Sequence, residues 1–296
     1  MGVLCSIKPA LNAPVTRIFA LLFWLVPSVF LSFGFGQLFK WSQREGHSAP
    51  VVITVNYLVL ATALAAYFTY RGDVLPSLPA LQIGALTGLL FIASMLTMTH
   101  ALTRLDSAPT LTSFRLAVIV PVFAGALLWN ETVSPGQVIG FFAAATSLVL
   151  LTWPPASHRE TRGLWWVCLI FILQGLSMCC LHAVHHAGLD TQRQHVLMIT
   201  AATAGLLGLL YASLRRIPLR SGALRMGVGI GMFNLVTLTV SLTALAHIPG
   251  TIFFPINGCG VVLLDNLFAH FAWREPLGRT GIAGAALGAL AMILIL

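Results

Sequence analysis

The stretch VVITVNYLVLATALAAYFTY, residues 51–70, contains twenty consecutive residues without a charged side chain. Twenty residues of α-helix rise about 30 Å, which matches the hydrocarbon core of a lipid bilayer. The stretch therefore predicts a membrane-spanning helix. Similar apolar runs recur along the chain, so the whole protein has to be interpreted in a membrane.

The composition of the 296 residues agrees with this interpretation. Hydrophobic residues make up 58% of the chain and charged residues only 8%, whereas a soluble domain has about 25% charged residues. So few charges cannot cover a soluble protein of this size, which excludes a cytosolic enzyme, a secreted domain and a disordered chain. The net charge of +8 does not indicate nucleic-acid binding, because the basic residues lie in short gaps between apolar runs.

Cutting the chain at polar clusters, proline and glycine gives ten apolar runs, and each is expected to form a transmembrane helix. The first run is longer than the apolar core of a typical signal peptide, so we interpret it as the first span. Few residues remain outside the runs, and any function must be carried by the membrane helices. The predicted spans are 18–39, 51–70, 79–100, 109–129, 137–153, 163–187, 195–214, 224–246, 249–272 and 279–296.

The two halves of the chain resemble each other. The first contains ALTRL at 101–105 and later Trp129-Asn130-Glu131; the second contains ALAHI at 244–248 and later Trp273-Arg274-Glu275. Two repeats of five spans, residues 1–156 and 157–296, would enter the membrane in opposite orientations, because five is odd. Such inverted repeats build two related gates around a midplane site in many secondary transporters. Chance similarity between apolar segments is the alternative explanation.

Two ionisable residues lie inside predicted spans, Arg115 in the fourth and Asp265 in the ninth. Charges at this depth are costly and mark either function or pairing. Arg115 is about 9 Å from the start of its span and Asp265 about 10 Å from the end of its span, at 1.5 Å per residue. These ends are on the same side, so we expect the two side chains to face the interior at one level. A buried ion pair that fixes packing and a gate or site for a charged substrate are equally weighted interpretations.

Other candidates for a solute path are polar or aromatic residues within spans. Ser113 adds a hydroxyl to the fourth span, which Pro109 and Pro121 make irregular, and the ninth span contains Pro255. Proline frees a backbone carbonyl, which is tolerated at membrane depth only against protein or water. Trp24 is the one tryptophan inside a span; it either faces lipid or forms part of a cavity wall.

These features together resemble those of a known family. The ten spans and the acidic residue in each W-x-E turn, followed by a Gly-rich helix, are similar to the drug/metabolite transporter superfamily, in particular its ten-span EamA-like branch. Residues 248–256, IPGTIFFPI, also resemble the I-P-x-x-I-x-aromatic-x-I pattern of the small multidrug resistance branch. In that branch the aromatic residue and a Trp three residues later face the binding chamber. The resemblance implies this place for Phe254 and Asn257, with Asn instead of Trp. It further implies that spans 1, 3, 4, 6, 8 and 9 surround the cavity.

Three histidines at the end of the sixth span, His182, His185 and His186, share one helix face and could bind a metal. The sequence shows no carboxylate near them except Asp190, so a polar helix end is the favoured interpretation and no metal site is predicted. The five cysteines are interpreted as apolar packing residues. Neither H-E-x-x-H, G-x-S-x-G nor a P-loop occurs, so we do not expect an enzyme or a cofactor.

The sequence therefore predicts an all-α polytopic membrane protein with ten transmembrane helices in two inverted five-helix repeats. The expected function is secondary active or facilitative transport of a small metabolite or drug-like solute by alternating access. Proton coupling stays open, as does the choice between a monomer and a homodimer. The alternative function is that of a non-transporting membrane protein, lipid-binding or scaffold, on the same fold.

The distribution of basic residues predicts the orientation. Loops after odd-numbered spans carry eleven Lys and Arg residues, and the opposite side carries four. The positive-inside rule then places both termini outside the cell membrane, with the bacterial inner membrane as the expected location. Ten-span relatives usually have both termini in the cytoplasm, so the resemblance implies the opposite orientation.

Overall fold

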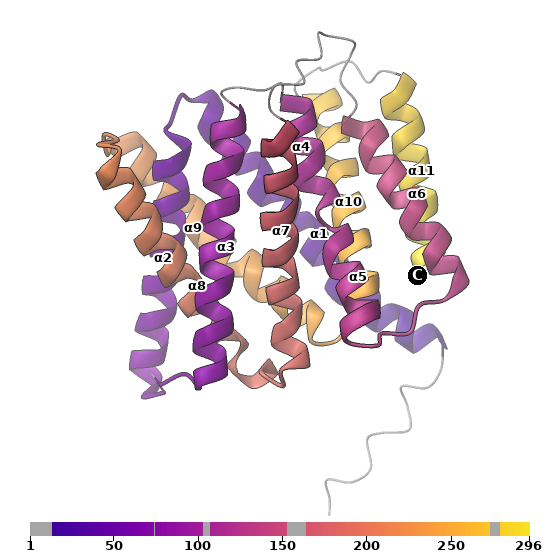
Figure 1. Ribbon diagram of the computed structural model, residues 1–296, viewed down its shortest axis with the longest axis horizontal. Coiled ribbons are helices and arrows are strands. Elements are labelled where there is room, and N and C mark those ends of the chain that lie inside the picture. Colours follow the sequence, from indigo (N-terminus) through magenta and orange to yellow (C-terminus); the bar gives the residue numbers. More distant parts are fainter. Residues whose placement is uncertain (1–13, 74, 103–106, 153–163, 273–278) are drawn as a thin grey trace, which may run out of the picture.

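The computed structural model of the protein describes residues 14–73, 75–102, 107–152, 164–272 and 279–296. All regular secondary structure in these ranges is helical, so the prediction of an all-α protein is confirmed (Figure 1). In chain order the elements are α1 (Pro14–Arg44), α2 (Ala49–Arg71), α3 (Leu78–Leu102), α4 (Ser107–Leu116), α5 (Ile119–Leu128), α6 (Pro135–Thr152), α7 (Leu164–His186), the 3-10 helix η2 (Asp190–Gln192), α8 (Arg193–Leu214), α9 (Ser221–Leu245), α10 (Gly250–Ala272) and α11 (Arg279–Ile295).

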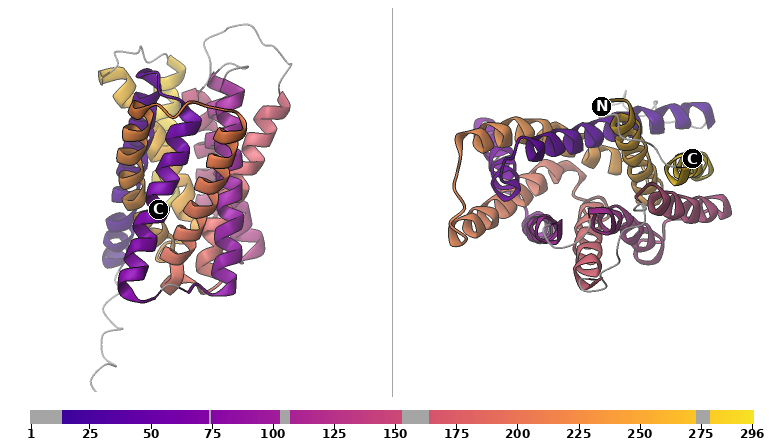
Figure 2. Two further views of the ribbon diagram at one scale, coloured as in Figure 1. Left: turned by 90° about the vertical axis from the view of Figure 1, so that its left-hand side faces the viewer. Right: turned by 90° about the horizontal axis from the view of Figure 1, so that it is seen from above.

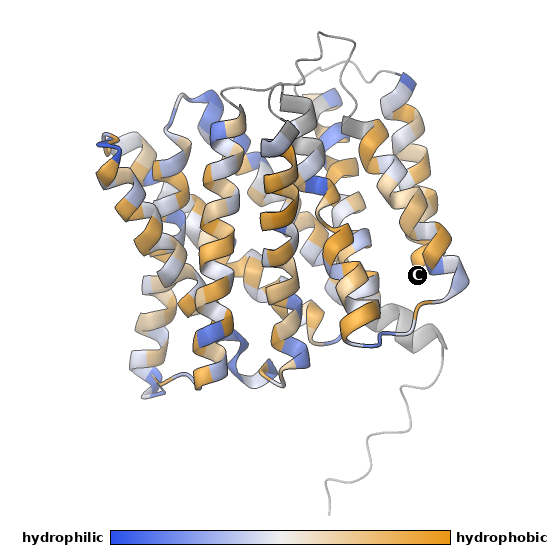
Figure 3. Ribbon diagram, in the orientation of Figure 1, coloured by the Kyte–Doolittle hydropathy of each residue, from blue (hydrophilic) through white to orange (hydrophobic). Residues whose placement is uncertain are grey.

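Within the described ranges, seven helices are long and apolar enough to cross a membrane: α1, α2, α3, α7, α8, α9 and α10. Three shorter apolar helical segments accompany them, at Ser113–Leu128, Pro135–Leu150 and Arg279–Ile295. Large apolar side chains such as Phe142, Leu214 and Ile293 are exposed on the outside of the bundle, and polar residues concentrate towards its two ends (Figure 3). An apolar outer surface of this extent is that of a multi-pass membrane protein, because it would aggregate in water.

The helices correspond to the predicted apolar runs with one difference. The run 109–129 forms two helices, because α4 ends at Leu116 and α5 begins at Ile119. Pro121 cannot donate a backbone hydrogen bond, and the carbonyl of Ala117 is met instead by the amide of Val120.

The ninth run forms one unbroken helix, because α10 continues through Pro255 even though this residue cannot donate a backbone hydrogen bond. The hydrogen bond that Pro255 cannot make is the one to the Thr251 carbonyl, in the first turn of the helix. Glu131, which is not part of α10, accepts hydrogen bonds from this first turn, as described below.

Figure 2 shows the packing of the helices in two further views. Helix α2 packs against α8 and α9, and α3 packs against α7 and α8. Helix α10 contacts α1, α5 and α11, and α6 and α11 lie side by side at one edge of the bundle. The helices of the two halves therefore interdigitate, and nearly every extensive contact joins one half of the chain to the other.

Glycines on the helix surfaces make these contacts close. A Cβ atom on Gly84 of α3 would lie 2.8 Å from the Cβ atom of Ile199 and 2.9 Å from the carbonyl oxygen of Val196, both on α8. One on Gly231 of α9 would lie 2.8 Å from the carbonyl oxygen of Asn56 on α2. The small-residue patterns thus serve packing within the chain, as glycine does in membrane helices.

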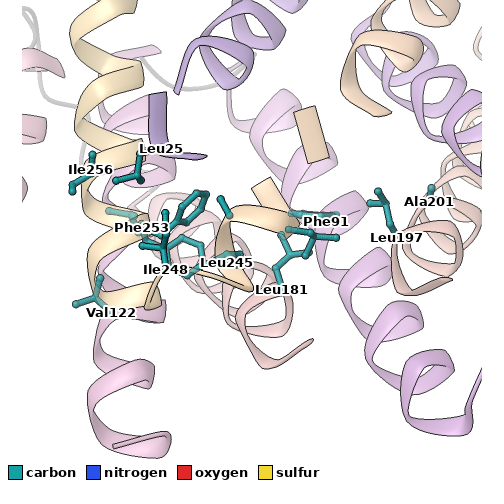
Figure 4. Close-up of a cluster of buried hydrophobic side chains, with 14 of the residues drawn as sticks. Leu25, Phe91, Val122, Leu181, Leu197, Ala201, Leu245, Ile248, Phe253 and Ile256 are labelled. Carbon is teal, nitrogen blue, oxygen red and sulfur yellow. The ribbon is translucent and has the colours of Figure 1, made fainter. Parts of the chain in front are cut away.

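Buried apolar side chains from several helices form the core. The main cluster joins Leu25 of α1, Phe91 of α3, Leu181 of α7 and Phe253 of α10, among others (Figure 4). Leu245 and Ile248, where α9 turns into α10, lie in the same cluster. The cluster runs across the middle of the bundle and joins helices from both halves of the chain.

Replacement of Gly88 by Ala tests the close packing of α3 on α8. An added Cβ would overlap the backbone carbonyl oxygen of Thr200, so Gly88→Ala should lower the stability by about 1–3 kcal/mol, as overpacking does. Gly229→Ala on α9 is the matched control, because nothing lies within 4 Å of the added atom; it should leave the melting temperature unchanged or raise it. Thermal unfolding in detergent measures both. Equal melting temperatures for the two variants would contradict this account of the packing.

Candidate functional site

Arg115 and Asp265 form an ion pair inside the bundle, about 10 Å before the C-terminal end of α10. Nη2 of Arg115, in the last turn of α4, lies 2.6 Å from Oδ2 of Asp265 on α10. The two side chains are 29% and 23% exposed, so the pair is largely covered by protein. The expected contact between the two residues is present, and its role in transport stays a prediction.

The second oxygen of Asp265 is also bonded. Nε2 of Gln37 on α1 donates a hydrogen bond of 2.8 Å to Oδ1. This set of contacts, Gln37–Asp265–Arg115, ties α1, α4 and α10 together. We call it the upper tie because α4 lies above α5 in Figure 1. Sequence reasoning did not single out Gln37, because a lone glutamine in an apolar run does not show which helix it faces.

Asn257 lies on α10 between the two ends of the bundle. It is eight residues before Asp265, or about 12 Å along the helix axis. Its side-chain Oδ1 is buried and has no hydrogen-bond partner among the residues that the structure describes. A buried amide oxygen without a partner is costly and calls for a water or a ligand group. Asn257 is therefore the strongest candidate among the predicted residues for contact with a polar solute.

The other three predicted residues have partners within the protein. The hydroxyl of Ser113 donates to the carbonyl of Val167, which joins α4 to α7. Trp24 stacks on the ring of His247, with centroids 5.5 Å apart. Phe254 is buried in the core with its ring edge-to-face against His182 at 5.5 Å. The structure therefore brings Arg115 and Asp265 together and places Phe254 closer to the histidines than to the ion pair along α10.

Near the start of α10 the structure corrects the interpretation of the histidine cluster. Oε1 of Glu131, in the turn after α5, lies 2.7 Å from Nε2 of His182 and 3.2 Å from Nε2 of His186. The carboxylate that seemed to be missing comes from the W-x-E turn, fifty-one residues earlier in the chain. Asp190, the neighbour in sequence, bonds His185 instead.

Glu131 also binds the start of α10. Its Oε2 accepts hydrogen bonds from the backbone amide of Thr251 at 3.0 Å and from the Thr251 hydroxyl at 2.8 Å. The amide of Gly250 points to Oε1 at 3.3 Å. A carboxylate here satisfies free amides of the first turn and opposes the positive end of the helix dipole. We call the contacts His182–Glu131–Thr251 the lower tie; they join α7, the α5–α6 turn and α10.

Local sequence explains how Glu131 reaches this place. Asn130 adopts a left-handed conformation with φ 51°, and the amide of Glu131 then bonds the carbonyl of Gly125 in α5. A Cβ on Gly125 would lie 2.9 Å from Oε2 of Glu131, so glycine makes room for the carboxylate. Gly250 does the same for His182, whose ring lies directly where a Cβ would be.

The environment keeps Glu131 ionised. Burial raises the pKa of this carboxyl, but hydrogen bonds from His182 and from the backbone and hydroxyl of Thr251 lower it by more. The pKa of Glu131 therefore lies well below its ordinary value. At neutral pH the lower tie contains a fixed negative charge.

A cavity of about 260 Å³ lies elsewhere, between the end of α2 and the start of α8. None of the six residues predicted for a solute path lines it, so it is not part of the candidate site. Its lining residues are Tyr67, Phe68, Arg71, Asp73, Asp190, Thr191, Arg193, Gln194 and His195.

Leucine substitutions test whether Arg115 and Asp265 stabilise the protein as an ion pair. Arg115→Leu or Asp265→Leu alone leaves one charge in apolar surroundings, a loss of about 3–5 kcal/mol for a buried pair, so the yield of folded protein should fall. If the pair is structural, the double variant should recover both yield and any transport. If the charges act on solute or protons, the double variant should fold but not transport. Monodisperse yield in detergent measures folding, and a double variant that folds no better than the worse single one would contradict the pairing.

The chain was also compared with known proteins. No protein family and no curated protein matches it. Solved structures do match, and one of them, described only as "Crystal structure of protein", has 15% sequence identity and a TM-score of 0.73 over 93% of this chain and 96% of that chain. At this identity the likeness shows a shared fold alone. The helical arrangement described here thus occurs in a solved structure over nearly the whole chain.

Proposed function

We propose that the protein is a ten-span secondary transporter, active or facilitative, that moves a small metabolite or drug-like solute by alternating access. The ten spans are α1, α2, α3, the rod formed by α4 and α5, and α6 to α11. The observation that carries this proposal is the position of Asn257, with its unpartnered buried oxygen, between two polar ties on the same helix, one at Thr251 and one at Asp265. Such an arrangement supplies a polar contact with a closure on either side of it.

The pattern of helix packing supports two inverted repeats of five spans. Exchanging the halves pairs α1 with α7, α2 with α8, α3 with α9, the α4–α5 rod with α10, and α6 with α11. The contact of α3 with α7 then corresponds to that of α9 with α1, and the contact of α3 with α8 to that of α9 with α2. The contact of α10 with α1 corresponds to those of α4 and α5 with α7. A pseudo-two-fold relation of this kind is typical of inverted-repeat transporters.

The same exchange relates the helices that the two ties join, although not the tie residues themselves, because the repeat pairs Glu131 with Glu275. The upper tie joins the fourth span and α10 to α1, and the lower tie joins them to α7, which is the counterpart of α1. Opening one tie while the other holds would expose Asn257 to one side of the membrane at a time.

One observation favours the alternative, a non-transporting lipid-binding or scaffold protein on the same fold. The apolar core runs from α1 through α3 and α7 to α10 across the middle of the bundle. A transporter must part this core between its two states, whereas a scaffold would keep it. The resemblance of the W-x-E turns and of residues 248–256 to drug/metabolite transporters weighs for transport.

Substitution at Asn257 tests the transport path. The first step is an uptake screen in proteoliposomes across amino acids, cations and nucleosides. For a transported solute, Asn257→Leu should raise the apparent KM up to about tenfold, the effect of one lost hydrogen bond. Phe254→Ser should also alter uptake. Thr146→Leu on α6 is the control, because this exposed hydroxyl bonds only the carbonyl of its own helix. Equal kinetics for the Asn257 variant and the control, at equal insertion, would place the path elsewhere.

A reporter fusion tests the orientation. Helix α1 begins and α11 ends at the same end of the bundle (Figure 1). The excess of basic residues in the loops at the opposite end predicts that this end faces the periplasmic side of a bacterial inner membrane. A C-terminal reporter that is active only in the cytoplasm should therefore be silent, and a periplasmic reporter should be active. The reverse pattern would show that the termini are cytoplasmic.

A further inference from the structure

Glu131, His182 and His186 place three metal-binding atoms at one point. One carboxylate oxygen and the two Nε2 atoms lie within 4.8 Å of one another. The two nitrogens are 3.3 Å apart, and Oε1 lies 2.7 Å from one and 3.2 Å from the other. In a tetrahedral site with metal–ligand bonds of about 2.0–2.2 Å, ligand atoms are separated by about 3.3 Å. A metal ion can therefore bind all three atoms with little movement of the side chains.

The three side chains are held in place by their surroundings. The indole of Trp129 stacks on His186 with centroids 4.5 Å apart and an interplanar angle of 4°, and it meets His182 edge-on at 4.6 Å. Gly250 lets the His182 ring lie against the start of α10. Ligands that are already oriented lose little freedom on binding a metal, which favours affinity.

We propose that this cluster is a binding site for a divalent transition metal ion of the Zn²⁺ class. Two imidazoles and one carboxylate are a ligand set that zinc uses in three-ligand sites, with a fourth position left for water. His182 is 1% exposed, Glu131 10% and His186 23%, so the ion would approach past His186. The cluster lies between the C-terminal end of α7, whose dipole favours a cation, and the start of α10, whose positive end is opposed by the Glu131 carboxylate.

The surroundings of His182 indicate that the ion binds reversibly. When Nε2 binds a metal, the proton of the neutral ring must be on Nδ1. This atom is buried and has no acceptor among the described side chains and backbone groups, whereas metal-bound histidines usually donate this proton to a neighbour. The site therefore binds more weakly than a structural zinc site.

A bound ion would strengthen the lower tie. It would link α7 directly to Glu131, whose other oxygen holds Thr251 of α10. This consequence rests on the proposed function: if the lower tie opens during transport, Zn²⁺ should slow uptake by holding it closed. The binding itself does not depend on transport.

Cobalt binding to the purified full-length protein tests the site, because tetrahedral Co²⁺ absorbs visible light and Zn²⁺ displaces it. The wild-type protein should show these bands, and Zn²⁺ should raise its melting temperature. His186→Gln and Glu131→Gln should each weaken Co²⁺ binding at least about tenfold, since even the loss of an outer hydrogen-bond partner costs 10–100-fold. His185→Gln is the matched control, one residue away and bonded to Asp190, and it should bind like the wild type.

Two results would overturn the proposal. One is a folded wild-type protein without tetrahedral Co²⁺ bands; the other is undiminished binding in both His186→Gln and Glu131→Gln. Neither depends on the transport assay. A protein that binds Co²⁺ through these residues but takes up no solute would keep the metal site and remove the proposed function. If the protein binds Co²⁺ through these residues but Zn²⁺ does not slow uptake, only the proposed link between metal binding and transport is lost.

Discussion

The rod formed by α4 and α5 is held against α10 by two charged contacts, one beside its break and one just beyond its end. Arg115 of α4 pairs with Asp265, and Glu131, in the turn after α5, binds Thr251. Helices in lipid gain little from the hydrophobic effect when they associate, so polar contacts and close packing determine which helices pair. These two contacts join the first half of the chain to the second at the centre of the bundle. Helices α1, α6, α7 and α11 pack against this pair.

The break between α4 and α5 lies on the face that meets α10. Ala117 and Val118 are buried, and a Cβ on Gly258 of α10 would lie 3.5 Å from Val118. Irregular backbone at membrane depth is tolerated where protein covers it, and α10 provides that cover. If the two halves of the broken rod tilt separately, the upper and lower ties can open one at a time, as the proposed alternating access requires.

Sequence reasoning predicted the features that depend on local chemistry. Helices followed from apolar length, and the level of Arg115 and Asp265 followed from the helical rise, because the depth of a residue in a straight helix is set by counting. The Glu131–His182 contact could not be found in this way, since it depends on which turn folds over which helix end. The continuity of α10 at Pro255 was missed for the same reason, because Glu131 supports its first turn from a distant part of the chain. The contact of Gln37 with Asp265 could not be predicted, because the sequence does not show which face of α1 packs against α10.

The central claim is that position 257 is reached from both sides of the membrane in turn. The most direct test is reaction of Asn257→Cys with a membrane-impermeant maleimide in oriented vesicles, in a chain whose five cysteines have been replaced. The account predicts labelling from either face, with no labelling of Thr146→Cys, which lies on the outer face of α6. Absence of labelling at position 257 from both faces would contradict it and would favour a filled, non-transporting bundle.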